Sequence, residues 1–162
     1  MPARPSPADD PRLDEVDRAI LRLLQQDGRL TNADLAKQVR LSPSPCLRRV
    51  KALEQDGYIT GYTAVLDPAR LQRALHVMVM VSLTSQRQEV LESFERAVTE
   101  LDDVLACYLI AGEADYLLTV AVKDLDAYQQ LYTRRLGELP GVASMKSLVT
   151  MKAVKASTAL PL

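Results

Sequence analysis

The 162-residue sequence contains no tryptophan, one phenylalanine, one histidine and two cysteines. Because His76 is the sole histidine, neither a Ser-His-Asp nor a Cys-His arrangement has a spare base, and no metal-ligand spacing is present. The phosphate-binding patterns G-x-x-x-x-G-K-[ST] and G-x-G-x-x-G are absent as well. We therefore expect no enzyme, no catalytic residue, no metal site and no cofactor.

The two cysteines, Cys46 and Cys107, are far apart in the sequence, which indicates reduced thiols in a cytoplasmic protein. No apolar run is long enough to span a membrane, so we expect no membrane partner. Residues 1–10 lack the basic and then apolar order of a secretory signal. We interpret residues 1–12 as a disordered arm.

Charge is distributed unevenly along a chain whose formal net charge is only −1. Residues 29–51 contain six basic residues and one acidic residue, a local net charge of +5. A basic patch within a nearly neutral protein is typical of a nucleic-acid-binding face, although a solvated surface is the common alternative.

Residues 41–57 predict a helix that lies on DNA. Ser42 can cap this helix, Pro43 and Pro45 fall in its first turn, where backbone N–H groups have no helical acceptor, and Gly57 ends it. Spacing of 100° per residue separates a packing face from a polar one. The packing face carries Cys46, Leu47, Val50 and Leu53, and the opposite face carries Ser44, Pro45, Arg48, Ala52 and Gln55.

Two further helices are predicted before it, one over residues 14–27 and one that begins at Thr31 and resembles a capping box with Asp34. Two short helices joined by a tight turn, the second one basic, indicate a helix-turn-helix, here without the usual glycine in the turn. Two β-prone runs around Gly61, within residues 58–66, predict a hairpin wing. Residues 13–66 are thus interpreted as a winged helix-turn-helix domain, against the alternative of a basic surface helix in an ordinary helical domain.

Position on the helix divides the predicted DNA contacts into two kinds. Ser44, Pro45 and Arg48 lie near the N-terminal end of the second helix of the motif, where side chains reach base edges. Arg29, Lys37, Arg49 and Lys51 are better placed for phosphates, where they add affinity without sequence information. The complete predicted DNA-binding set is Arg29, Lys37, Ser42, Ser44, Pro45, Arg48, Arg49 and Lys51.

The periodicity changes after a hinge at residues 67–74, and we place a second domain at residues 75–162. It predicts strands at 75–83, 104–111, 116–122 and 142–154, with helices at 90–101 and 124–136. The order β-α-β-β-α-β is that of a ferredoxin-like sandwich, so the fold class is α+β. Since the strand at 75–83 is apolar on both faces, we expect its second face to be covered by another subunit.

The turn at residues 112–116 has two interpretations. It is a plain hairpin turn, in which Gly112 gives backbone freedom and Asp115 makes local hydrogen bonds. Alternatively, its backbone groups and the Asp115 carboxylate border a cleft for a small zwitterion.

Several motifs, in order and with their spacing, resemble the Lrp/AsnC family over residues 13–157. They are Asp14-x-x-Asp17-x-x-Ile20-Leu21, Asp27-Gly28-Arg29, Leu41-Ser42-Pro43-Ser44-Pro45-Cys46-Leu47-x-Arg49-Val50, Leu53-Glu54-x-x-Gly57-x-Ile59-x-Gly61-Tyr62, Gly112-x-x-Asp115-Tyr116-Leu117-Leu118 and Leu139-Pro140-Gly141-Val142.

The resemblance implies a bacterial, cytoplasmic and nucleoid-associated transcription regulator of amino-acid metabolism. Its implied partners are double-stranded DNA, a free amino acid, and other copies of the chain in dimers that assemble into octamers or larger discs. Leucine and methionine are the leading effectors, while other branched-chain amino acids, proline and cysteine stay open. The implied effector residues are Gly112, Asp115, Tyr116, Leu125, Leu148, Val149 and Thr150.

Two other functions remain to be weighed. An architectural DNA-wrapping protein with little effector response needs only the basic patch and the oligomer-forming strand. A stand-alone enzyme or metabolite-binding module is disfavoured by the missing catalytic constellation.

Overall fold

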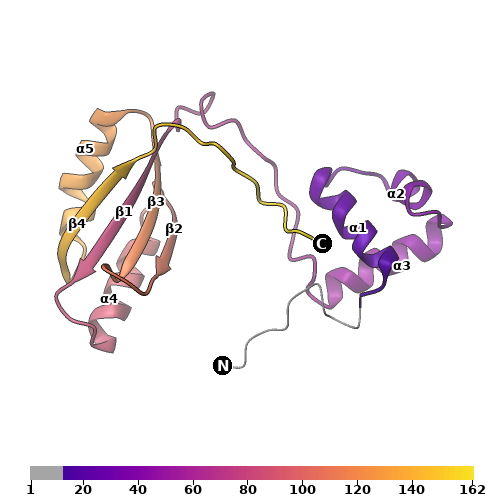
Figure 1. Ribbon diagram of the computed structural model, residues 1–162, viewed down its shortest axis with the longest axis horizontal. Coiled ribbons are helices and arrows are strands. Elements are labelled where there is room, and N and C mark those ends of the chain that lie inside the picture. Colours follow the sequence, from indigo (N-terminus) through magenta and orange to yellow (C-terminus); the bar gives the residue numbers. More distant parts are fainter. Residues whose placement is uncertain (1–12) are drawn as a thin grey trace. The chain divides into compact units, whose positions relative to one another are not determined.

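The computed structural model describes residues 13–162, so the predicted arm at residues 1–12 lies outside the described residues (Figure 1). The chain divides into two compact units. One runs up to Val65 and includes Ala156–Leu162, and the other is Leu66–Lys155. The last seven residues therefore group with the first unit, whereas the sequence places them in the second domain.

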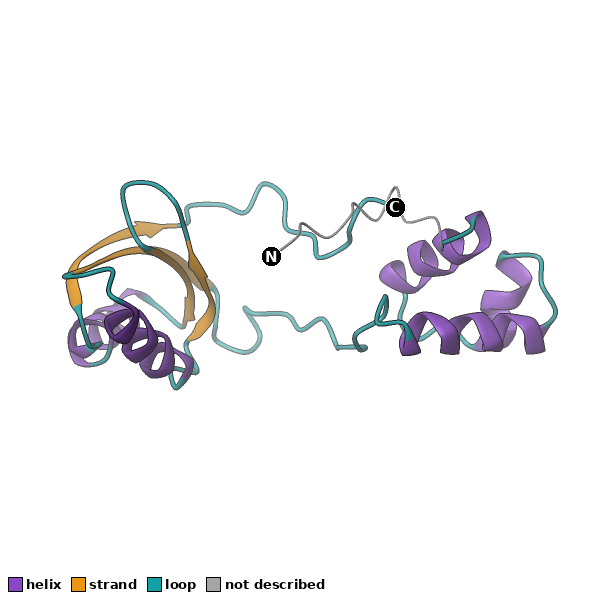
Figure 2. Cartoon of the chain, turned by 90° about the horizontal axis from the view of Figure 1, so that it is seen from below, coloured by secondary structure: helices purple, strands orange, loops and turns teal. Residues whose placement is uncertain are grey.

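Three helices form the first unit, as predicted: α1 (Glu15–Gln26), α2 (Asn32–Gln38) and α3 (Pro43–Gln55) (Figures 1 and 2). Their apolar faces meet in one core, in which Ile20, Leu35 and Cys46 are almost completely buried. Asp14 and Thr31 occupy the predicted capping positions, where each accepts a hydrogen bond from a backbone N–H three residues later.

An ion-pair cluster joins the start of α1 to the middle of α3. The Arg49 guanidinium lies 2.6 Å from Asp14 Oδ2 and 2.8 Å from Asp17 Oδ1. The backbone N–H of Asp17 and the nearby guanidinium lower the pKa of Asp14, and the two carboxylates raise the pKa of Arg49. These contacts link the start of α1 to the middle of α3 through partly exposed charged side chains.

The turn between α2 and α3 is tight although it has no glycine. Arg40 takes the left-handed conformation there, with φ at 57°, and the Leu41 N–H donates to Ala36 O at 2.9 Å. Ser42 occupies the N-cap of α3, but its side chain makes no capping hydrogen bond. Pro45 stands where a third-residue N–H would be the donor, and proline has none.

The predicted hairpin wing at residues 58–66 is wrong, because no strand forms there. Tyr58 and Ile59 donate their N–H groups to Leu53 O at the end of α3, and the chain then continues without ladder pairing. Gly61 is a single residue between the two runs, too short for a two-residue hairpin turn, and an isolated hairpin is marginal in water.

A four-stranded antiparallel sheet forms the second unit, with strand order β2-β3-β1-β4. Two helices cover one face (Figure 2), and the predicted βαββαβ sandwich is confirmed. The elements are β1 (Leu75–Leu83), α4 (Gln88–Thr99), β2 (Val104–Leu109), β3 (Tyr116–Val122), α5 (Leu125–Arg134), a 3-10 turn at Leu136–Glu138, and β4 (Val142–Val149).

The last strand is shorter than predicted, since β4 ends at Val149 and not at residue 154. Its neighbour β1 begins at Leu75, and Val149 already lies opposite Val77. One more bond, from the Thr150 N–H to His76 O at 3.0 Å, closes the ladder. Residues beyond it have no strand partner, so pairing stops.

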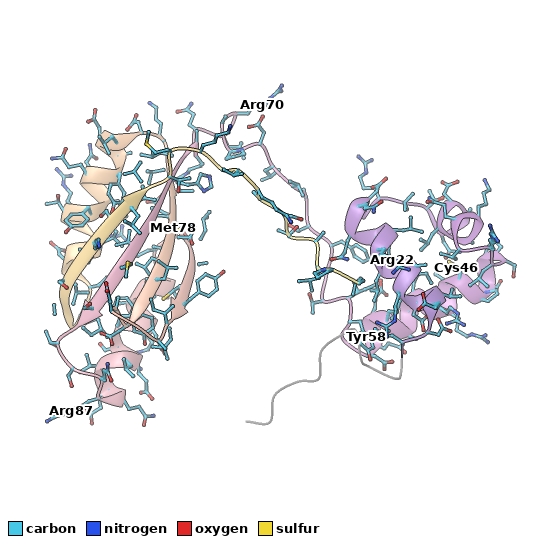
Figure 3. The ribbon with its side chains drawn as sticks, viewed as in Figure 1. Arg22, Cys46, Tyr58, Arg70, Met78 and Arg87 are labelled. Carbon is cyan, nitrogen blue, oxygen red and sulfur yellow. The ribbon has the colours of Figure 1, made fainter. Side chains whose placement is uncertain are left out.

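The two faces of β1 differ sharply in their environment. Val77, Val79 and Val81 are 0% exposed beneath the helices, whereas Met78 on the opposite face is 44% exposed (Figure 3). Cross-strand partners of Met78 are Thr119 and Leu148. The strand is apolar on both faces as predicted, and its second face is open in the single chain.

Replacing Gly141 with alanine is expected to destabilise the second unit by about 2–4 kcal/mol. Gly141 has φ at 76°, and a Cβ there would lie 2.6 Å from Val90 Cγ1, so backbone strain and overpacking combine. Gly57→Ala is the control, because φ is 77° and nothing lies within 4 Å of its Cβ. Urea unfolding followed by amide resonances of each unit measures both losses, and equal losses would contradict the steric account.

Asp14→Asn is expected to cost no more than about 1 kcal/mol near neutral pH, since an exposed ion pair contributes little and asparagine still caps the helix. The folded-state pKa of Asp14 lies below its usual value of 3.8. Its charge therefore stabilises the fold above that value, and this contribution disappears as pH falls through the lowered pKa. Urea midpoints of the two proteins should converge in acid; a difference independent of pH would refute the electrostatic origin.

Candidate nucleic-acid interface and effector site

Helix α3 presents an exposed polar face that begins at its N-cap and extends to Lys51. Ser42, Ser44, Arg48 and Lys51 are exposed, and Pro45 is half-buried. Within residues 13–162, neither Arg48 nor Lys51 forms an ion pair. Three predicted DNA-binding residues of α3 and the N-cap before it are thus exposed, and two of these four are cations without an ion pair among the described residues.

The other three predicted phosphate contacts differ in how available they are. Arg29 is exposed after α1, and Lys37 is exposed on α2 with Asp34 at 3.6 Å. Arg49 already contacts two carboxylates, Asp14 and Asp17. Its guanidinium has to leave these partners in order to reach a phosphate, unlike that of Arg48.

Leu47 was expected to pack with Cys46, yet it is 43% exposed, whereas Cys46 is fully buried. Burial also raises the pKa of the Cys46 thiol. The packed arc of α3 is therefore narrower than the sequence predicts. An exposed leucine next to Arg48 in the sequence can contact a thymine methyl group. Helical periodicity alone did not predict that Leu47 is exposed.

Asn32 is a second residue that the sequence did not identify. Its Nδ2 donates to Pro43 O at 2.8 Å, which ties the start of α2 to the start of α3. Its Oδ1 is buried and has no hydrogen-bond partner in the described part of the chain. The bond holds the N-terminal turn of α3 in place, and only the packed helices reveal it.

In the second unit, Asp115 sits in the turn between β2 and β3 and fastens another loop to it. Its carboxylate accepts the N–H of Leu83 at 2.7 Å and the side-chain amide of Gln86 at 2.9 Å. Gly112 in the same turn has φ at 147°, a conformation that other residues rarely adopt. Gln86 is 29 residues from Asp115 in the sequence, so the local sequence pattern did not predict this contact.

Tyr116, also a predicted effector residue, is almost entirely buried. Its hydroxyl donates to Glu95 Oε1 at 2.7 Å, and its ring lies 4.6 Å from that of Phe94. Burial and the Glu95 carboxylate raise the pKa of Tyr116. Tyr116 therefore anchors the turn from inside the core.

The remaining predicted effector residues gather at the opposite end of the sheet. Val149 pairs with Val77 near the start of β1, whereas Tyr116 pairs with Val81 near its end. At about 3.3 Å per residue, these two positions are about 13 Å apart along the strand. Leu125, Leu148 and Val149 are exposed, and Thr150 is half-buried. One chain does not bring the two groups together.

A groove of about 610 Å³ lies elsewhere, between residues 71–73 and α5, and contains none of the predicted site residues. Its charged lining residues are Arg73, Asp103, Lys123, Arg134 and Arg135. Among residues 13–162 there is no cluster of three or more side chains suited to a metal ion. Nor does this part of the chain contain a helix long and apolar enough to cross a membrane.

Comparison with known families matches both units. Residues 13–60 match a winged helix-turn-helix DNA-binding domain, and residues 76–160 match the Lrp/AsnC ligand binding domain. The leucine-responsive regulatory proteins of Escherichia coli K12 and Salmonella typhimurium are each 45% identical over 148 residues, which cover 91% of this chain and 90% of theirs.

Solved structures are also similar to this chain over most of its length. A transcriptional regulator of Neisseria meningitidis in complex with L-methionine has a TM-score of 0.88 and 38% identity, covering 92% of this chain and 96% of its own. An AsnC family regulator of Agrobacterium tumefaciens has a TM-score of 0.88 and 39% identity, covering 92% and 97%. The chain therefore belongs to the Lrp/AsnC family of DNA-binding transcriptional regulators with a ligand-binding domain.

Proposed function

We propose that this protein is a sequence-specific regulator of amino-acid metabolism whose DNA binding or assembly is modulated by a small amino acid. The observation that carries the proposal is the exposed face of α3, with Ser44 and with Arg48 and Lys51, which have no ion-pair partner within residues 13–162, in a chain that also holds a ligand-binding domain. Double-stranded DNA is then the main partner, in the cytoplasm of a bacterium and associated with the nucleoid. No catalytic role is needed.

Within the interface, Ser44, Pro45 and Arg48 contact base edges from the N-terminal half of α3. Lys51, Arg29 and Lys37, with Ser42 at the helix start, contact phosphates. We propose a double role for Arg49: it holds α3 against α1 through its two carboxylates, and it adds positive potential near the phosphates.

The proposed effector is leucine or methionine. Support comes from the leucine-responsive relatives and from the Neisseria regulator bound to L-methionine. The effector residues are Gly112, Asp115 and Tyr116 at one end of the sheet, and Leu125, Leu148, Val149 and Thr150 at the other. Because about 13 Å separates the ends, we propose that one amino acid meets residues from two subunits.

Self-association is part of the proposal, as a dimer that assembles into an octamer or larger. The open face of β1 supports it, because Met78 and its neighbour Leu148 are exposed apolar side chains on a sheet. An effector that prefers one assembly state changes how many recognition helices meet spaced DNA sites at once.

An architectural DNA-wrapping protein with little effector response is the alternative. The basic segment at residues 29–51 and the open sheet face favour it, since both serve wrapping without a ligand. The two functions differ in whether free amino acids change stability, assembly or DNA affinity.

Arg48→Ala is expected to weaken binding by about 1–3 kcal/mol at a site selected from random DNA, and to relax the base preference. Lys51→Ala should weaken binding to all sequences alike and reduce the salt slope by about 1. Arg70→Ala, an exposed cation in the second unit, is the control. Titrations at several salt concentrations measure all three, and unchanged affinity in the first two would refute the interface.

When free L-amino acids are tested one by one, we expect only leucine or methionine to raise the melting temperature of the protein. A ligand at a hundred times its Kd stabilises the folded form by about 2.7 kcal/mol. Leu148→Ala should diminish the shift, while Leu109→Ala, an exposed leucine that is not among the predicted effector residues, should keep it. Gel filtration with each ligand reports assembly. If no amino acid acts while DNA still binds, the architectural alternative is favoured.

A further inference from the structure

The last residues of the described chain dock on α1. Gln25 forms a reciprocal pair with the backbone of Leu160: its Oε1 accepts the Leu160 N–H at 2.6 Å, and its Nε2 donates to Leu160 O at 3.1 Å. Arg22, one turn earlier, donates to Leu162 O at 3.1 Å (Figure 3). Side chains of α1 therefore bind the backbone of this segment, and the Gln25 amide supplies both a donor and an acceptor to Leu160.

Side-chain packing supports the same docking. Leu162 is partly buried and packs against the apolar core of the first unit. The Ala159 N–H donates to Ser157 Oγ at 3.1 Å, which shapes the segment just before its contact with Gln25. Residues 156–162 thus pack as part of the DNA-binding unit, although they follow the second unit in the sequence.

The docking is also limited in strength. Both Gln25 and Arg22 are exposed, and so is Leu160. Hydrogen bonds between exposed groups contribute little net stability because water replaces them. A contact of three such bonds and one half-buried leucine releases far more easily than a helix of the core.

Chain continuity joins this contact to the proposed effector site. Leu148 and Val149 end the last strand, Thr150 follows it, and only residues 151–155 separate them from the docked segment. Those five residues contain no helix or strand. Residues 151–155 therefore connect the end of β4 to the segment that docks on α1, in addition to the connection through residues 67–74.

We propose that residues 156–162 are a releasable strap that couples the effector site to the helix-turn-helix unit; the inference rests on the proposed function. An amino acid bound at Leu148–Thr150 changes the course of residues 151–155 and so shifts the balance between docked and released strap. The docked strap restrains α1, and with it α3, relative to the effector domain. By linkage, DNA binding and effector binding then each alter strap docking.

Gln25→Ala is the test, because it removes both bonds to Leu160 while alanine keeps the helix. Gln26→Ala is the matched control: it is the same residue type, exposed on the same helix, and it makes none of the hydrogen bonds that hold residues 156–162 to α1. A chain that stops after Lys155 serves as a second variant. Hydrogen exchange at residues 156–162 reports docking, and titrations with and without L-leucine or L-methionine report coupling.

We expect Gln25→Ala and the shortened chain to bind DNA within about twofold of the wild type, with amino-acid binding retained by calorimetry. The change in DNA affinity produced by the amino acid should fall by a factor of about 5 or more, the size of a typical coupling. Exchange at residues 156–162 should rise in Gln25→Ala and not in Gln26→Ala.

A full effector response in Gln25→Ala, with the strap released, would overturn the coupling and leave the proposed function intact. Strap exchange in the wild type as fast as in Gln25→Ala would overturn the docking itself. If no amino acid altered the DNA affinity of the wild-type protein, the proposed function itself would be refuted, and the coupling with it. This failure is distinguishable from the others because it is seen without any substitution.

Discussion

The second unit depends on one constraint: β1 is hydrogen-bonded along both edges and apolar on both faces. Its valines are buried under α4 and α5, which sets the register of β3 and β4 on either side. The same register places Asp115 and Tyr116 at one end of the strand and Val149 at the other. A single chain is left with an uncovered sheet face and with the predicted effector residues in two separate groups, and the proposed self-association accounts for both.

The first unit depends on a different kind of restraint, because α3 has only a narrow packed arc. Cys46 and Leu53 are buried, and polar contacts supply the remaining orientation: Arg49 with two carboxylates on one side, and Asn32 with Pro43 O on the other. These contacts involve side chains outside the exposed reading face, so base preference and helix placement can change independently.

Regulation of DNA binding by an effector requires that the proposed effector site in the second unit be coupled to helix α3 in the first unit. Affinity for spaced DNA sites depends on how many recognition helices engage at once, so a modest change in their restraint has a large effect on binding. The strap at residues 156–162 is suited to this task because its contacts are specific but exposed. A rigidly buried segment in the same place would stabilise the unit without responding.

Local signals in the sequence determined the helices, the βαββαβ order and the polar face of α3, because capping residues, period and turn residues act over a few positions. The hairpin at residues 58–66 and the extension of β4 to residue 154 were wrong, since strands need a partner and neither segment has one. Only the tertiary structure decided the pairing of Arg49, the exposure of Leu47, the contact of Gln86 with Asp115 and the separation of the predicted effector residues. Each of these depends on residues distant in sequence, whose proximity arises only from packing.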